Sequence, residues 1–433
     1  MKSNTTVVSL SAPWGCVLAV ALWVCAGGVG VPDQGVRPAS RAASRWDPGT
    51  GAWTEAPPLS IARSHHTATL LPDGRVLIAG GESPDGDDAA ERSWELWGPD
   101  AAPGRQGDLA ASAGRSAVAL TLPDGRAVLL GGRLDAKAPQ IWTPDTMRWT
   151  GGAPYRRPIG GWEFACAALP DGHVLVTGGA GASLWDTAED RWANWEAFPF
   201  STSRPQALAL ADGRMLVVGE GDPEAGGHPP ERRSLFLVGA PGGSEWRLAA
   251  SWPGDGEWHR LAQLASGDVL VLRQDNSAWT SVALWDPTTA ILTPMPGPSV
   301  DVYNSSLIAL DDGRALLVVP PGPLVWSPSD QRWTAVPMPP SPLLGHAAVR
   351  LADGGVLVTG GTGPWEHRVD AKHLVGGIFG GVAALALIIA AGAWIRRHRP
   401  SSAALTSALA IAFVAGGALY LALAVVSGLG RMG

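Results

Sequence analysis

Three histidines stand in the same local context, each seven residues before the turn residue of an apolar hairpin: His66, His259 and His346. Neutral imidazoles are common ligands of transition metals, and three that converge could bind one. A ligand set needs converging side chains, and these three come from well-separated copies of a repeated segment. We therefore predict no metal site and no cofactor, and we keep the three histidines as candidate binding residues.

A second group of candidates combines arginines, a glutamate and aromatic side chains in or beside long connections. Aromatic residues next to Arg and Glu suit a protein-binding or sugar-binding surface. The alternative is that these residues only pack between structural elements. The members of this group are Arg156, Arg157, Trp162, Glu163, Arg204, Trp258 and Tyr303.

The chain offers little for catalysis. Cys166 is the one cysteine outside the apolar N-terminal stretch, and it lies in the apolar run FACAAL, where we expect it to pack. The sequence contains no GxSxG, HExxH or phosphate-binding glycine loop, the motifs that place a nucleophile, a zinc ion or a nucleotide. We predict no catalytic residue and favour a binding or scaffold role, while an enzyme remains the alternative.

Composition limits the class of protein and of partner. The chain has 433 residues, of which 46% are hydrophobic, and it contains 56 Gly and 37 Pro. Such a chain can bury a core, and its many turn-formers favour an all-β fold over disorder. Charged residues are sparse and the net charge is −7. Because no basic stripe is present, we expect no nucleic-acid partner.

Both ends of the chain have the character of membrane segments. Residues 1–31 resemble a signal peptide or an uncleaved signal anchor. Residues 374–395 and 403–429 contain no charged side chain, and each is long enough to span a bilayer. The Arg-rich loop 396–402 belongs in the cytoplasm by the positive-inside rule. This topology predicts a multi-pass cell-membrane protein with residues 32–373 on the extracytoplasmic side.

The middle of the chain repeats a hairpin pattern of two apolar runs around a tight turn, often followed by Gly-Gly. Asp-Gly between alternating apolar residues is a strong hairpin signal, and it predicts a type I′ turn with positive φ at both central residues. Consecutive turn glycines are 41 to 54 residues apart, as in propeller blades of about 40–50 residues. The turn glycines are Gly74, Gly125, Gly172, Gly213, Gly267, Gly313 and Gly354.

A second hairpin falls between these turns. It is marked by two tryptophans seven residues apart around turn-forming residues, as in Trp46 and Trp53 or Trp142 and Trp149. Two degraded copies contain Trp97 and Trp246. Two hairpins per repeat make a four-stranded antiparallel blade, and seven blades close into a β-propeller.

The order of the hairpins predicts how the ring closes. The repeats begin with a Trp hairpin at 46–53 and end with an Asp-Gly hairpin at 346–361. Neither is a whole blade, so we expect one blade to be shared between the two ends, which removes two exposed sheet edges. The predicted propeller covers residues 44–363, between linkers at 32–43 and 364–373.

The sequence pattern HTATLLPDGRVLIAGG…W…DP…W resembles kelch repeats, in particular the bacterial type similar to the central domain of galactose oxidase. The resemblance covers about residues 44–363 and implies the seven-bladed fold. A copper site like that of galactose oxidase would need paired tyrosines, two histidines and a cysteine. The repeat region offers Tyr155, Tyr303 and Cys166. The resemblance thus leaves a galactose-oxidase-like oxidase or a sugar-modifying enzyme as the alternative.

Strand alternation predicts which face of the propeller is functional. With strands a to d counted outward, the tight a–b and c–d turns share one face, and the long b–c and d–a connections share the other. Binding residues concentrate on loops held by a rigid scaffold. We therefore expect the long-loop face to bind another protein or a glycan near the membrane surface.

Overall fold

The computed structural model describes residues 39–363 with several internal gaps. The gaps are 84–88, 99–105, 133–136, 156–163, 179–180, 194–195, 200, 223–231, 241–244, 255 and 276–279. The predicted signal segment and both predicted membrane spans lie outside the described residues. Among the described residues there is no helix long and apolar enough to cross a bilayer.

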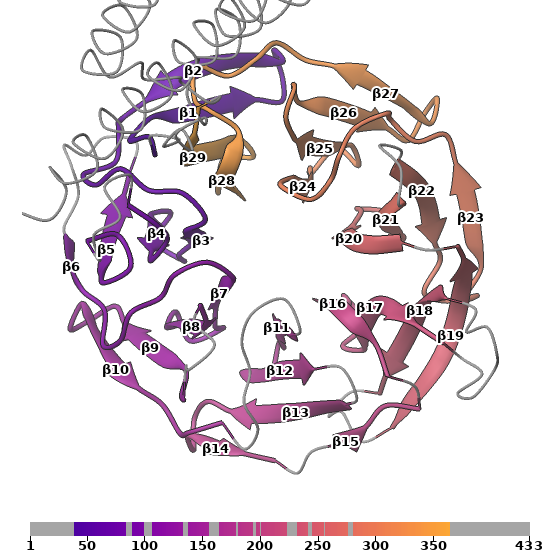
Figure 1. Ribbon diagram of the computed structural model, residues 1–433, viewed down its shortest axis with the longest axis horizontal. Coiled ribbons are helices and arrows are strands. Elements are labelled where there is room, and N and C mark those ends of the chain that lie inside the picture. The colour runs from indigo at the N-terminus through magenta and orange to yellow at the C-terminus, as the bar shows by residue number, and fades with distance from the viewer. Residues whose placement is uncertain are drawn as a thin grey trace, which may run out of the picture. The chain divides into compact units, whose positions relative to one another are not determined.

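Seven antiparallel sheets of four strands each surround one axis, so the fold is a seven-bladed β-propeller (Figure 1). We number the blades 1 to 7 along the chain, starting with the sheet that contains β3. The innermost strand of each blade lies nearest the axis. These strands are β3 (Thr67–Leu70), β7 (Ala117–Thr121), β11 (Phe164–Ala168), β16 (Ser203–Ala209), β20 (Gly256–Gln263), β24 (Ser306–Ala309) and β28 (Leu344–Arg350).

The remaining strands follow outward in each blade. The second strands are β4 (Val76–Ala79), β8 (Ala127–Gly131), β12 (His173–Gly178), β17 (Met215–Gly221), β21 (Val269–Asp275), β25 (Ala315–Val318) and β29 (Val356–Thr362). The third strands are β5 (Ser93–Trp97), β9 (Gln140–Thr143), β13 (Gly181–Asp186), β18 (Arg233–Gly239), β22 (Thr280–Trp285), β26 (Leu324–Ser327) and β1 (Ala43–Asp47). The outermost strands are β6 (Gln106–Asp108), β10 (Arg148–Gly151), β14 (Arg191–Trp192), β19 (Trp246–Pro253), β23 (Leu292–Met295), β27 (Arg332–Ala335) and β2 (Ala52–Ala56). Blade 3 also carries the short strand β15 (Glu196–Ala197), which pairs with β13.

The predicted closure of the ring is confirmed. Blade 7 has the strand order β2-β1-β29-β28, so its outer half comes from the N-terminal side and its inner half from the C-terminal side of the propeller. Trp46 lies opposite Val356 in this sheet. Ser40 donates its backbone N–H to the Gly361 carbonyl at 2.8 Å, so the two ends of the propeller leave it side by side.

The a–b turns differ from the predicted turn type. In blade 1 the Gly74 amide donates to the Leu71 carbonyl and the Leu71 amide donates to the Arg75 carbonyl. Gly74 has a φ of 83°, and no other residue of this turn has a positive φ. The loop is therefore a type I turn followed by a left-handed glycine, and the type I′ prediction is wrong. The length of the loop explains the difference, because three residues separate Leu71 from Arg75, whereas a type I′ hairpin has two.

The hydrophobic core is distributed between the blades. Seven clusters of buried apolar side chains each join two neighbouring blades, and the last one joins blade 7 to blade 1. Large, fully buried tryptophans of the third strands anchor five of these layers. They are Trp46, Trp142, Trp185, Trp285 and Trp326. Each lies opposite a small or β-branched residue at the start of the second strand, which leaves room for the indole.

The paired glycines at the ends of the second strands permit close contact between blades. Gly360 has a φ of 62°, and a Cβ there would lie 2.4 Å from the Arg63 carbonyl oxygen of blade 1. Gly80 has a φ of 68°, and a Cβ would lie 2.3 Å from the Ala113 carbonyl oxygen of blade 2. Only glycine combines the left-handed conformation with this lack of space.

Arginines following the turn glycines link neighbouring blades on the tight-turn face. Arg314 binds Asp312 within its own turn and donates from Nη2 to the Pro48 carbonyl of blade 7 at 2.7 Å. Arg214 makes the same pair of contacts with Asp212 and with the Pro287 carbonyl of blade 5. These bonds tie the turns of one face together, and the other face remains the one with the long connections.

Candidate functional site

Three predicted site residues from neighbouring blades form one continuous stack on the long-loop face. Arg204 is in β16 of blade 4, Trp258 is in β20 of blade 5, and Tyr303 lies in the connection that precedes β24 of blade 6. The Arg204 guanidinium carbon lies 5.2 Å from the centroid of the Trp258 ring, within the range of a cation–π contact. The Trp258 and Tyr303 rings meet edge to face, with centroids 4.7 Å apart.

A buried carboxylate holds the arginine end of this stack. The Glu220 side chain is 3% exposed, and its Oε1 accepts a hydrogen bond from Arg232 Nη1 at 2.9 Å. Its Oε2 lies 3.9 Å from Arg204 Nη1, which is an ion-pair distance without a hydrogen bond. Oε2 is buried and accepts no hydrogen bond from the described part of the chain. One carboxylate thus faces two guanidiniums and keeps an unused acceptor.

The connection that carries Tyr303 is fixed by a second arginine. Arg260 donates to the carbonyls of Tyr303, at 2.5 Å, and of Ser305, at 2.8 Å. Asp301 accepts the Tyr303 amide at 2.8 Å. Burial lowers the pKa of Arg260 to about 10, so its guanidinium remains charged at neutral pH. These bonds keep the Tyr303 ring against Trp258.

His66 and His259 lie inside the ring instead of on its surface. His259 Nε2 is 2.8 Å from the Ser234 hydroxyl of blade 4, and His66 Nε2 is 2.9 Å from the Thr359 hydroxyl of blade 7. Each histidine therefore bridges to the preceding blade. Burial lowers the pKa of His259 to about 3 and that of His66 well below its usual value.

His346 lies at the start of the innermost strand of blade 7. Its Nδ1 is 2.6 Å from the Leu343 carbonyl, which requires the proton on Nδ1. Burial lowers the pKa of His346 to about 4, although the Leu343 bond acts in the opposite direction. The structure thus places His66, His259 and His346 in three different blades, and none of them contributes to the Arg204–Trp258–Tyr303 stack.

Of the other residues considered in the sequence, four lie outside the described ranges and one is buried. Arg156, Arg157, Trp162 and Glu163 lie outside the described residues. Cys166 is a buried free thiol in the layer between blades 2 and 3, and burial raises its pKa. Within the described ranges, no three His, Cys, Asp or Glu side chains are grouped so that they could hold a metal ion.

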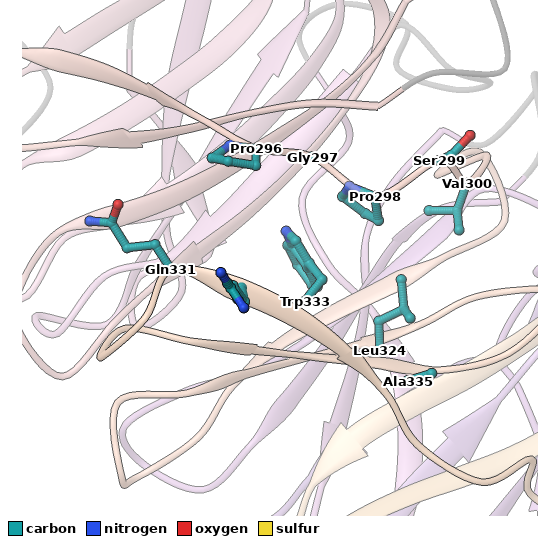
Figure 2. A pocket seen from close by; sticks show the side chains of 10 residues that line it. Pro296, Gly297, Pro298, Ser299, Val300, Leu324, Gln331, Trp333 and Ala335 are labelled. Carbon is teal, nitrogen blue, oxygen red and sulfur yellow. The ribbon is translucent and has the colours of Figure 1, made fainter.

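An apolar groove lies on the rim, away from this stack (Figure 2). It has a volume of about 490 Å³ and runs between the connection that leaves β23 and the outer strands of blade 6. Pro296 and Pro298 lie along one side, and Gln331, Trp333 and Ala335 lie along the other. Trp333 is half-buried, as Trp258 is. The groove therefore contains a tryptophan, Trp333, that has the same burial as Trp258 but lies outside the candidate site.

Sequence reasoning missed Glu220 and Arg232. Glu220 occupies the second position of the Gly-Gly pair that stands at the end of the second strand in blades 1, 2, 3 and 7. At that position a side chain projects from the long-loop end of the strand and must be accommodated between connections. The departure from the repeat was therefore the available signal that blade 4 carries a distinct polar group at this face.

The fold defines the class of this protein as a seven-bladed β-propeller with four-stranded antiparallel blades. No protein-family model matches its sequence. No curated protein matches it significantly.

Proposed function

We propose that this protein is a membrane-anchored binding module of the kelch type, which presents its propeller on the extracytoplasmic side. The long-loop face of blades 4–6 binds another protein or a glycan near the membrane. The observation that carries this proposal is the stack of Arg204, Trp258 and Tyr303, since it is assembled from three blades and its members are partly exposed. The anchoring rests on the uncharged segments 374–395 and 403–429.

Physical reasons favour binding over packing for this stack. Seven inter-blade clusters already supply the apolar core, and Trp258 and Tyr303 belong to none of them. Tryptophan, tyrosine and arginine are also the residues that dominate binding hot spots. A rigid scaffold that orders them in advance reduces the entropy lost on binding.

Affinity capture with the full-length chain in its native membrane tests the proposal. We expect wild-type protein to recover a bound protein or glycoconjugate, and Trp258→Ala to lose it. Trp333→Ala is the matched control, because it removes a half-buried tryptophan of the rim groove. Recovery of the same material by all three proteins would place binding elsewhere and contradict the proposal.

A further inference from the structure

We propose that the rim groove of blade 6 contacts the phospholipid surface of the membrane in which the chain is anchored. This inference rests on the anchoring part of the proposed function and adds an orientation to it. The groove lies on the outside of the ring, between the connection that leaves β23 and the strands β26 and β27 (Figure 2). None of the residues that line it belongs to the Arg204–Trp258–Tyr303 stack, so lipid contact and partner binding use different side chains.

The length of the chain limits how far the propeller can lie from the membrane. Gly363 is the last described residue of the propeller, and ten residues separate it from the uncharged segment 374–395. Ten residues span at most about 36 Å when fully extended. Gly363 follows β29 of blade 7, which packs against blade 6 through a shared apolar cluster. A tether this short holds blade 7 and its neighbours, blades 6 and 1, near the membrane surface.

Among these three blades, blade 6 has the rim that best suits a membrane surface. The outermost strands of the other two carry exposed carboxylates, Glu55 in β2 of blade 7 and Asp108 in β6 of blade 1. Such groups are repelled by anionic lipid headgroups. The outermost strand of blade 6, β27, has the sequence Arg-Trp-Thr-Ala and no carboxylate. The charge of the rim therefore favours blade 6 as the side that faces the lipid.

The apolar side chains of this rim match the membrane–water interface. Trp333 is half-buried, and Pro296 and Pro298 lie across the groove from it (Figure 2). Tryptophan is enriched at membrane interfaces because its ring is amphipathic. Met338 is 56% exposed, and its Sδ would lie 3.1 Å from a Cβ on Gly322, two residues before the start of β26. Met338 thus extends the apolar surface beyond the end of the groove.

Arg332 supplies the polar contact that a phospholipid requires. Its side chain lines the groove, is exposed, and makes no hydrogen bond or ion pair within the described part of the chain. A guanidinium binds a phosphate through two parallel hydrogen bonds, while its apolar stem can lie along a hydrophobic surface. No acidic residue lines the groove. Because the tether keeps lipid at high effective concentration, even a weak contact of this kind would be occupied.

Fluorescence quenching in vesicles tests this inference with the full-length chain. A nitrobenzoxadiazole fluorophore is attached at Met338→Cys or, in a matched variant, at Ile291→Cys, after Cys16 and Cys25 are replaced by alanine. Ile291 is 60% exposed and lies just before β23, at the tight-turn face. The vesicles contain phosphatidylcholine and phosphatidylglycerol, with or without a nitroxide-labelled phospholipid. We expect the nitroxide to quench the fluorophore at position 338 more strongly than at position 291.

Two substitutions and a control show whether the groove makes the contact. Trp333→Ala and Arg332→Glu should each reduce the quenching at position 338, and Arg332→Glu should do so most in vesicles that contain phosphatidylglycerol. Arg148→Glu is the matched control, because Arg148 is the first residue of β10 in blade 2 as Arg332 is of β27. It should leave the quenching unchanged. Thermal unfolding of each variant shows whether its fold is intact.

Equal quenching at positions 338 and 291, no quenching at 338, or quenching that survives both Trp333→Ala and Arg332→Glu would overturn the inference. Position 338 unquenched in vesicles but shielded from an aqueous thiol reagent in native membranes would mean that a protein covers the groove, and the inference would also fail. If the chain enters vesicles and its capture of a partner still depends on Trp258, the proposed function stands without lipid contact. A chain that does not enter vesicles would contradict the proposed anchoring as well.

Discussion

Trp46 lies directly opposite Val356 in the sheet register, although the two residues stand at opposite ends of the propeller sequence. Trp46 is fully buried in the layer between blades 6 and 7. The pair joins the first strand of the propeller to the last, so the ring has no open blade. Stability should therefore depend on this N-terminal strand as strongly as on strands in the middle of the chain.

The first prediction compares Trp46→Ala with Trp142→Ala. Both tryptophans are 0% exposed and occupy the same position in their blades. Removal of a large buried aromatic side chain costs about 3–5 kcal/mol, so both variants should lose a similar free energy of unfolding. Chemical denaturation of the full-length chain measures it. A loss well below 1 kcal/mol for Trp46→Ala, beside a large loss for Trp142→Ala, would contradict the closure.

The second prediction concerns the buried ion pair of Arg63 and Glu95. Their side chains are 0% and 4% exposed, and Arg63 Nη2 lies 3.1 Å from Glu95 Oε1. Removing one partner leaves a buried charge uncompensated and costs about 3–5 kcal/mol. We expect Arg63→Met to lose that much and Arg63→Met with Glu95→Leu to lose less than the sum of the single changes. Additive losses in a double-mutant cycle would show that the two charges do not interact.

The third prediction is a loss of stability on acidification that arises from buried histidines. The pKa of His259 is about 3 and that of His346 about 4 in the folded protein, both below the ordinary value of about 6.5. Below pH 6.5 the unfolded chain therefore binds protons that the folded chain does not. Stability is fully present above about pH 6.5 and decreases as the pH falls toward 4.

Thermal unfolding at pH 7.5 and at pH 4.5 measures this effect. His259→Gln keeps an amide that can bond the Ser234 hydroxyl but does not titrate. Its melting temperature should fall less between the two pH values than that of the wild type. An identical fall in both proteins would assign the acid sensitivity to other groups.

The blade architecture could be predicted from sequence because two local signals repeat. Asp-Gly or Ser-Gly between apolar runs marks each inner hairpin, and paired tryptophans such as Trp326 and Trp333 mark most outer ones. In the structure these two tryptophans are directly opposite each other. Because these turn residues and tryptophans recur in each repeat, the strand order can be predicted from the sequence without knowledge of any long-range contact.

The candidate site was harder to predict from the sequence than the fold, because it depends on contacts between blades. Arg204, Trp258 and Tyr303 were predicted as separate members of one face, and only the structure brings them into one stack. His66 and His259 were predicted on the same face, but each is buried and hydrogen-bonded to a hydroxyl of the preceding blade. Glu220 was missed because its departure from Gly-Gly was interpreted only as a weakened repeat, although it places a carboxylate beside Arg204 and Arg232.

The most direct test of the binding face is site-specific photocrosslinking in intact membranes. Tyr303 is replaced by p-benzoylphenylalanine in the full-length protein, and Thr50, an exposed residue of a tight turn in blade 7, is replaced in a matched variant. The account predicts a crosslinked adduct from position 303 that is lost when Trp258→Ala is added, and no such adduct from position 50. Equal crosslinking from both positions, or from position 50 alone, would contradict it.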